Sequence, residues 1–194
     1  MNHYPQQASH DGVPDWFALL QQALHANPQP SARYLQLASL DDAGAPTCRT
    51  LVCRQLLAPG TLVMTTDLRS DKLRGLQQNP LAEACWYLPA RQQQFRLRGT
   101  LRVQGSGHGS SLREALWDSV SPATRQTFTR PAPGRRLGAA EAFERPVPTS
   151  IPECFGLLLL QPQRVDYLDL AASPHARQLF EFKGGEWHRR ALNP

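Results

Sequence analysis

The sequence predicts a mainly β protein, a β-barrel with flanking helices. Many short segments alternate apolar and polar residues, turns rich in Gly and Pro separate them, and only a few stretches have helical periodicity. Many short strands joined by short turns are typical of a closed or split barrel. The 194 residues suffice for one domain with a substantial core. We assign residues 13–194 to that domain and residues 1–12 to a loose leader.

The elements follow from periodicity and from the residues that interrupt it. A helix from Pro14 to Leu24 has apolar residues every three to four positions and ends before Asn27-Pro28. Later helices are expected at 71–78, with Ser70 as its cap, and at 111–120, with a Ser-x-x-Glu capping box. The proline-rich segment 130–153 is expected to be irregular. The expected strands are 33–40, 47–56, 61–66, 81–88, 92–104, 154–161, 165–170, 180–183 and 187–192.

The charge is basic and is carried almost entirely by arginine. The formal net charge is +5, and 19 of the 21 basic residues are Arg, so that Lys72 and Lys183 are the only lysines. An arginine surplus fits nucleic acid, a phosphorylated small molecule, or simply GC-rich coding. No aromatic side chain alternates with the arginines of segment 92–104 in the way that a base-stacking surface requires. We therefore expect a small-molecule substrate and no nucleic acid as partner.

Composition also excludes several other classes. No apolar run approaches the roughly 18–20 residues that a membrane span needs, so no membrane partner is expected. The first residues lack the order of a signal peptide, and the four cysteines show no CxxC spacing. We expect a cytoplasmic protein with reduced thiols and no metal site. The sequence contains neither G-x-G-x-x-G nor a Walker A motif.

Two segments carry residues suited to an anion. In Thr65-Thr66-Asp67-Leu68-Arg69-Ser70-Asp71-Lys72 a strand ends and a helix begins, and hydroxyl and cationic donors gather within eight residues. In Arg49-Thr50-Leu51-Val52-Cys53-Arg54 charges bracket an apolar strand that precedes the first segment and should pair with it. Arg49 could then approach the same anion as Lys72. A capped surface helix and two arginines at exposed strand ends remain the alternative interpretation.

A third segment, Gln94-Phe95-Arg96-Leu97-Arg98-Gly99, presents an amide and two guanidinium groups on one face of a strand. A Gln side chain both donates and accepts, which suits the edge of a heterocycle. The alternative is a solvated face with cross-strand ion pairs. The order and spacing of the three segments resemble the FMN-binding split barrels of the pyridoxamine 5'-phosphate oxidase type, in their short bacterial branch. The resemblance covers roughly residues 30–194.

The resemblance implies a cofactor, a set of ligands and an assembly. FMN would be held at its phosphate by Arg49, Ser70 and Lys72, with Arg69 replacing a basic residue that the family has where Asp71 stands here. The ring would lie along Thr50, Leu51 and Val52, with Arg54 near its pyrimidine edge and Thr65 and Thr66 beside the ribityl chain or phosphate. Gln94 would bond to the ring system from a second subunit, because family members are homodimers with flavin at the interface.

The substrate side matches the family less well. Leu168 stands where the oxidases carry a Trp, and the segment from Ala171 to Arg177 only loosely resembles the family's Arg-x-His element. We place His175 toward the substrate, Arg177 toward the flavin, and Trp117 with Arg125 as a clamp for a flat anion; a core Trp and a surface Arg are the alternative. The resemblance implies an FMN-dependent oxidoreductase in which flavin accepts a hydride and dioxygen reoxidises it. A flavin-binding or storage module without turnover is the alternative.

Overall fold

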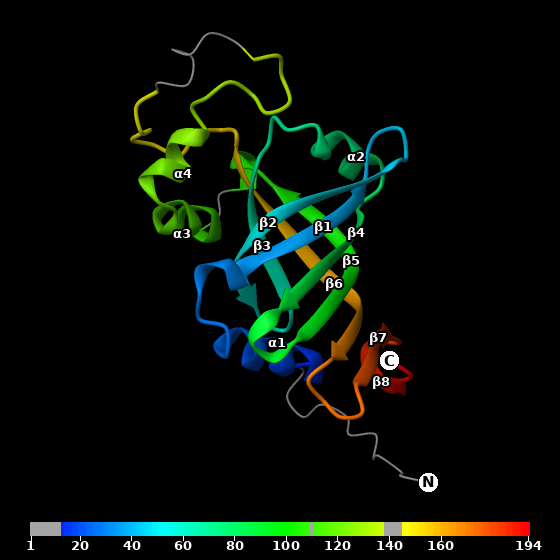
Figure 1. The fold of residues 1–194 in the computed structure, drawn as a ribbon. Helices are drawn as coiled ribbons and strands as arrows, with labels where there is room; N and C mark the ends of the chain where they lie inside the picture. Colours follow the sequence, from blue (N-terminus) through cyan, green and yellow to red (C-terminus); the bar gives the residue numbers. More distant parts are fainter. Residues whose placement is uncertain (1–12, 109–110, 138–144) are drawn as a thin grey trace.

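The computed structural model describes residues 13–108, 111–137 and 145–194. In these parts of the chain, eight strands form one antiparallel sheet in the order β3-β2-β1-β4-β5-β6-β7-β8 (Figure 1). Strand β3 also pairs with β6, which closes the first six strands into a barrel and confirms the expected fold class. The strands are β1 (Tyr34–Leu40), β2 (Pro46–Leu57), β3 (Thr61–Asp67), β4 (Leu81–Leu88), β5 (Gln93–Gln104), β6 (Phe155–Asp169), β7 (Ala176–Lys183) and β8 (Glu186–Leu192).

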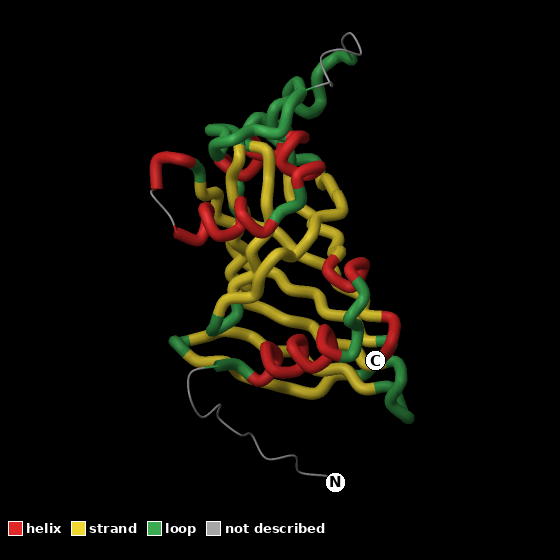
Figure 2. The backbone as a smooth tube through the Cα atoms, turned by 90° about the vertical axis from the view of Figure 1, so that its left-hand side faces the viewer, coloured by secondary structure: helices red, strands yellow, loops and turns green. Residues whose placement is uncertain are grey.

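Four α-helices flank the described barrel. Figure 1 shows α1 (Asp15–His25) at one end, α2 (Lys72–Gln78) at the opposite end, and α3 (Ser111–Ser119) with α4 (Pro122–Thr127) along one side. Figure 2 shows the same separation of α1 from the other helices after a quarter turn. Three short 3-10 turns complete the described helical elements: η1 (Pro30–Arg33), η2 (Pro89–Arg91) and η3 (Ser106–His108). None of the described helices has the length and apolarity needed to cross a membrane.

Strand alternation fills the barrel and leaves a second core outside it. Leu35 and Leu37 of β1 and Phe95 and Leu97 of β5 are almost fully buried inside, while their neighbours along the strands face outward. Burying each such side chain contributes about 1.5–3 kcal/mol. Outside the barrel, α3 packs on β3 and β6 through a cluster formed by Val63, Leu116, Trp117, Val120, Phe128, Phe155 and Leu157. Both faces of β3 are therefore covered at this point.

One expected strand break does not exist. Segments 154–161 and 165–170 are parts of a single strand, β6, which passes through Pro162. Pro162 is paired with Gly99, at the place where the β5–β6 register shifts. A proline is tolerated in a strand at such an irregularity, because no ladder hydrogen bond is needed from its nitrogen. Gly99 is required there, since a Cβ would overlap the carbonyl oxygen of Gln161.

Other boundaries also differ from expectation. Strand β7 begins at Ala176 and not at residue 180, and helix α4 was not expected. The signal for α4 was present, because Ser121 accepts a hydrogen bond from the backbone N–H of Thr124 and Pro122 occupies the first turn. Helix α2 starts at Lys72 after Asp71, without a side-chain cap, so Ser70 is not its cap. The expected leader, residues 1–12, lies outside the described residues.

Candidate functional site: two cations at one end of the barrel

Arg49 lies at one end of the barrel on the inner face of β2. It is paired with Leu37, a core residue of β1, so the two side chains share that face. Its Nη1 donates to the Leu37 carbonyl oxygen at 3.1 Å and to the Ser39 Oγ at 2.7 Å, and its Nη2 donates to the Thr47 Oγ1. All these acceptors are neutral. They orient the guanidinium without neutralising its charge.

The turn between β3 and α2 brings a second cation to the same end. Lys72 Nζ donates to the Ser70 Oγ at 2.6 Å and to the Thr66 Oγ1 at 3.2 Å. Ser70 in turn donates to the carbonyl oxygen of Asp67 at 2.7 Å, which fixes the hydroxyl. Thr66 is almost fully buried and shares the inner face of β3 with Met64. The ammonium group is thus held by hydroxyls on a short, tightly bonded turn.

The two cations are close enough to influence one another. Burial and the nearby Arg49 lower the pKa of Lys72, although Asp67 and Asp71 act in the opposite direction. Burial also lowers the pKa of Arg49. Neither side chain forms a salt bridge with a carboxylate of the described chain. Two partly buried cations, each bonded to hydroxyls and without a salt-bridge partner among the described residues, favour a bound anion, which would offset their desolvation and their mutual repulsion.

A glycine lets α2 approach closely enough to place Lys72. Gly75 packs on the end of β1, where a Cβ would overlap the carbonyl oxygen of Leu40 and press on Asp41. Its position one turn after Lys72 means that any side chain would push the helix away from the barrel. The sequence alone gave no reason to single out Gly75, because the contact joins two elements 35 residues apart, between Leu40 and Gly75.

Arg69 does not join the two cations, contrary to expectation. Its Nη2 and Nε donate to the Asp67 carboxylate at 2.6 and 3.0 Å, and Asp67 is the main cause of its raised pKa. The remaining donors reach the carbonyl oxygens of Arg130 and Phe128. Asp71 is also engaged elsewhere, since it accepts from Arg74 at 2.8 Å. The cation group therefore consists of Arg49 and Lys72, with Thr66 and Ser70.

The other residues expected along the flavin divide between the two faces of the sheet. Leu51 packs against the barrel core, whereas Thr50 and Val52 point outward, opposite Gln36 and Tyr34 of β1. Thr65 lies on the outer face of β3, the opposite face from Thr66. The side chains of these residues do not converge on one point. The residues are instead neighbours in sequence of Arg49 on β2, or of the β3–α2 turn at the end of β3.

Gln94 lies on the outer face of β5 and is not near Arg49 within this chain, because β1 and β4 separate β2 from β5. Its Oε1 accepts a weak hydrogen bond from Cys85 Sγ at 3.8 Å, and it is paired with Tyr87. The remaining polar face carries ion pairs, with Arg96 Nε 2.7 Å from Glu83. The alternative interpretation of this segment, a face with cross-strand ion pairs, thus holds for Arg96 beside Gln94.

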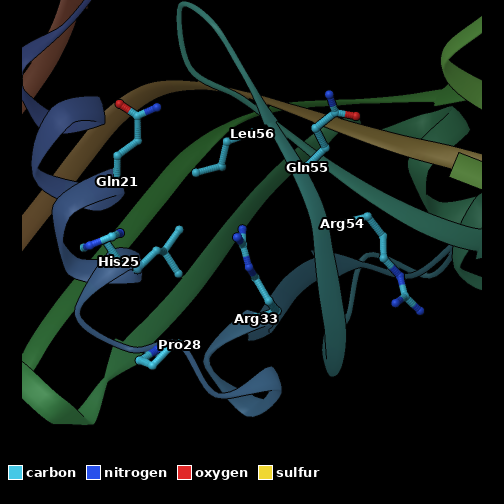
Figure 3. Close-up of a pocket in the computed structure, with 8 residues that line it drawn as sticks. Gln21, His25, Pro28, Arg33, Arg54, Gln55 and Leu56 are labelled. Carbon is cyan, nitrogen blue, oxygen red and sulfur yellow. The ribbon is translucent and has the colours of Figure 1, made fainter. Parts of the chain in front are cut away.

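Arg54 lies at an irregularity in the β2–β3 pairing. Its Nε is buried and has no hydrogen-bond partner among the described residues. Arg54 also borders a cleft of about 530 Å³ between α1 and β2 (Figure 3), whose lining includes Gln21, His25 and Arg33. In Figure 3 the Arg54 guanidinium points away from α1. The cleft contains neither Arg49 nor Lys72 and is separate from the cation group.

The residues expected on the substrate side are dispersed. Trp117 is buried in the outer core, where it contacts Phe128 and Phe155 edge to face, and Arg125 covers its ring at 5.2 Å. A ring so enclosed cannot stack on a ligand, so the core interpretation holds for Trp117, whereas a substrate-side role for Arg125 stays a prediction. The Arg125 Nη2 donates to the backbone carbonyl of Asp118 at 3.0 Å, and its Nε is buried without a partner in the described chain.

Arg177 and His175 follow the loop after β6. Arg177 forms a two-pronged ion pair with Asp166, at 2.9 and 2.7 Å, and Asp166 is almost fully buried. Because of that pair, the pKa of Asp166 is lowered. His175 is exposed on the loop before β7. Sequence reasoning missed Asp166, and also Ser39 and Thr47, because their roles depend on strand register and not on a motif.

Comparisons with known proteins show which proteins this chain is similar to. Residues 13–105 match the family model described as pyridoxamine 5'-phosphate oxidase, FMN-binding domain. A pyridoxine/pyridoxamine 5'-phosphate oxidase 2 of Arabidopsis thaliana is 33% identical over 168 residues, covering 81% of this chain and 84% of the relative. A pyridoxine/pyridoxamine 5'-phosphate oxidase of Pseudomonas putida is 29% identical over 187 residues, covering 92% and 85%.

Solved structures give the same result at the level of the fold. A pyridoxamine 5'-phosphate oxidase-related FMN-binding protein from Nostoc punctiforme superposes with a TM-score of 0.85 at 39% identity, covering 94% of this chain and 99% of the other. PhzG from Burkholderia lata, solved with tetrahydrophenazine-1-carboxylic acid, gives a TM-score of 0.77 at 20% identity, with 95% of each chain covered. The second similarity concerns the fold alone.

Proposed function

The chain belongs to the pyridoxamine 5'-phosphate oxidase FMN-binding family, and from that premise we propose that it is an FMN-dependent oxidase. The observation that carries the proposal is the pair Arg49 and Lys72, two partly buried cations that form no salt bridge with a carboxylate of the described residues. A phosphate monoester carries between one and two negative charges near neutral pH. It is the type of anion that this pair, with two hydroxyls, is built to receive.

The donor set fits the FMN phosphate. Arg49 offers a guanidinium already oriented by Ser39 and Thr47, and Lys72 offers an ammonium held by Ser70 and Thr66. A guanidinium binds phosphate with two parallel hydrogen bonds, and a lysine adds a point charge. The backbone of Thr50 to Val52 leads from Arg49 along the sheet and would support the ring. Arg69, bound to Asp67, is not part of the set.

Bound flavin would supply hydride acceptance, with dioxygen as the reoxidant. The chain's own residues would bind and orient it, and no protein nucleophile is required. Arg54 has a buried Nε without a hydrogen-bond partner among the described residues, and a cation there would stabilise negative charge at the ring's pyrimidine edge or on a substrate anion. Arg125, whose Nε is likewise buried and unpartnered within the described chain, is the second cation assigned to the substrate side.

The site would be completed by a second copy of the chain. Gln94 is separated from Arg49 by two strands in one chain, so a shared flavin would need Gln94 from a partner. The outer face beside it exposes Tyr87, opposite Gln94, and Tyr34, opposite Val52; the two residues are 45% and 49% exposed, respectively. Large exposed rings on a sheet face are typical of an interface. The proposal is therefore a homodimer with FMN between its subunits.

The experiment that tests the function uses the purified protein loaded with FMN. Pyridoxamine 5'-phosphate is added under air, and hydrogen peroxide release and aldehyde formation are measured. We expect both products in equal amounts, and loss of both with Arg49→Ala. Tight FMN binding without any peroxide would overturn the oxidase assignment for this substrate.

One alternative function has an observation in its favour. The substrate-side residues do not assemble in the described chain, since Trp117 is enclosed in the outer core and His175 is exposed on a loop. A protein that binds flavin without turning over a substrate would need only the cation group. The two functions differ in one measurement: the binding protein would give a flavin spectrum that no B6 phosphate ester reduces in the absence of air.

A further inference from the structure

Segment 128–137, called the strap below, contacts the β3–α2 turn, which carries Lys72 of the cation group. It follows directly after α4, the helix that bears Arg125. Two contacts join the strap to the β3–α2 turn. Arg69 donates to the carbonyl oxygens of Phe128 and Arg130, and Gly134 packs so closely on Asp71 that a Cβ there would lie 2.7 Å from a carboxylate oxygen. One turn is therefore in contact with both the phosphate side and the strap.

Asp67 orients the Arg69 side chain for its contact with the strap. Asp67 accepts from the backbone N–H of Arg69 at 2.8 Å and from its Nε at 3.0 Å, and the second carboxylate oxygen accepts from Nη2 at 2.6 Å. The Asp67 side chain is only 12% exposed. An ion pair this enclosed holds the guanidinium plane in one orientation, which leaves Nη1 directed at the Arg130 carbonyl at 3.0 Å.

The carbonyl groups that Arg69 reaches lie at and beyond the C-terminal end of α4. The last carbonyl groups of a helix have no hydrogen-bond donors within the helix, and an arginine side chain near that end can donate to them. Here the arginine comes from 59 and 61 residues away in the sequence. The amides of Phe128, Thr129 and Arg130 bond back to residues 125–127, so the end of α4 and the start of the strap form one bonded unit.

We propose that Arg69 is a positioning residue that fixes the C-terminal end of α4 and the strap on the β3–α2 turn, and thereby holds Arg125 relative to Arg49 and Lys72. Arg69 does not bind the cofactor phosphate in this scheme. Its effect on turnover, but not its effect on the strap, rests on the proposed function. Replacement of Arg69 would leave FMN binding largely intact and would loosen the segment that bears the substrate-side cation.

The test compares Arg69→Gln and Arg69→Lys with Arg190→Gln, a control that removes an exposed arginine paired with Glu181 far from the strap. Hydrogen–deuterium exchange of the full chain is followed without FMN and with saturating FMN. In Arg69→Gln the amides of residues 128–130 should exchange about five- to tenfold faster in both states, as expected for the loss of charge-assisted hydrogen bonds. Arg69→Lys should be intermediate, and exchange in β4 and β5 should not change.

Kinetics and binding supply the second part of the test. With pyridoxamine 5'-phosphate, Arg69→Gln should raise KM about tenfold with kcat within about twofold, and the FMN dissociation constant should stay within about threefold. Unchanged exchange at residues 128–130 would overturn the proposal, and so would an FMN affinity that falls as far as in Lys72→Ala. If the parent protein does not oxidise the ester, the oxidase proposal fails, while the exchange result still decides the role of Arg69.

Discussion

The two cations of the site differ in the groups that surround them. Arg49 has four neutral oxygen acceptors around it, whereas Lys72 depends on two hydroxyls and lies close to Arg49. Each therefore carries a charge that the protein orients but does not neutralise. A bound phosphate would supply the missing negative charge.

Replacing Lys72 with Ala should weaken FMN far more than riboflavin, which lacks the phosphate. A hydrogen bond to a charged group contributes about 1.5–3 kcal/mol, so the FMN dissociation constant should rise about 10- to 150-fold. Fluorescence titration of the flavin-free protein measures both ligands. Lys183→Ala is the matched control, because Lys183 is the other lysine and its side chain is 66% exposed. Equal losses for FMN and riboflavin would contradict a phosphate contact.

The lowered pKa of Lys72 gives a pH dependence with a definite sign. Without ligand, burial and Arg49 disfavour the ammonium form, so Lys72 loses its proton at a lower pH than the roughly 10.4 of an unfolded lysine. FMN affinity should fall as pH rises through that window, because the neutral amine attracts phosphate less. The ligand-free protein should instead gain stability there, since the unfolded chain binds more protons.

Isothermal titration calorimetry with FMN between pH 7 and about 10 tests the predicted fall in FMN affinity, and Lys72→Arg provides the comparison. Arginine keeps its charge throughout this range, so that variant should show a flatter profile. A fall of the same size in Lys72→Arg would assign the titration to a different group. Thermal unfolding of the ligand-free protein over the same range tests the predicted gain in stability.

At the scale of the element, α2 sets the geometry of the site. Its seven residues begin at Lys72, and Gly75 lets the helix rest on the end of β1. Gly75→Ala should lower the melting temperature and weaken FMN at least tenfold, because the new methyl group must displace α2 and with it Lys72. The control is Gly107→Ala, where a Cβ would meet no atom within 4 Å. Unchanged FMN affinity in Gly75→Ala would show that α2 does not position Lys72.

The sequence predicted most elements because their signals are local. Alternation predicted β5, and the Gly184-Gly185 pair predicted the β7–β8 hairpin. The join of two expected strands through Pro162 could not be predicted, because the compensating partner is Gly99 on another strand. The proximity of Arg49 and Lys72 could be predicted, because β2 and β3 are consecutive antiparallel strands and Lys72 follows β3. The hydrogen bonds from Arg69 to the strap could not be predicted, since their acceptors are carbonyl groups 59 and 61 residues away in the sequence.

At the scale of the whole molecule, the outer face of β1, β2, β4 and β5 should be an interface. Size-exclusion chromatography with light scattering should give twice the chain mass of 21.6 kDa. Tyr34→Glu combined with Tyr87→Glu should yield monomers, because two charges per subunit would enter the proposed interface, and should also abolish tight FMN binding. Leu137→Glu, at a residue 80% exposed in the strap, is the control and should remain dimeric. A monomeric parent protein that still binds FMN tightly would contradict the shared site.

The most direct test of the account is the spectrum and phosphate dependence of flavin binding by the parent protein. Purified protein, or flavin-free protein reconstituted with FMN, should be yellow. It should hold FMN at least about a hundredfold tighter than riboflavin, as two charge-assisted phosphate contacts imply. A protein that stays colourless after reconstitution, or that binds the two flavins equally, would contradict the assignment of Arg49 and Lys72 as the phosphate site.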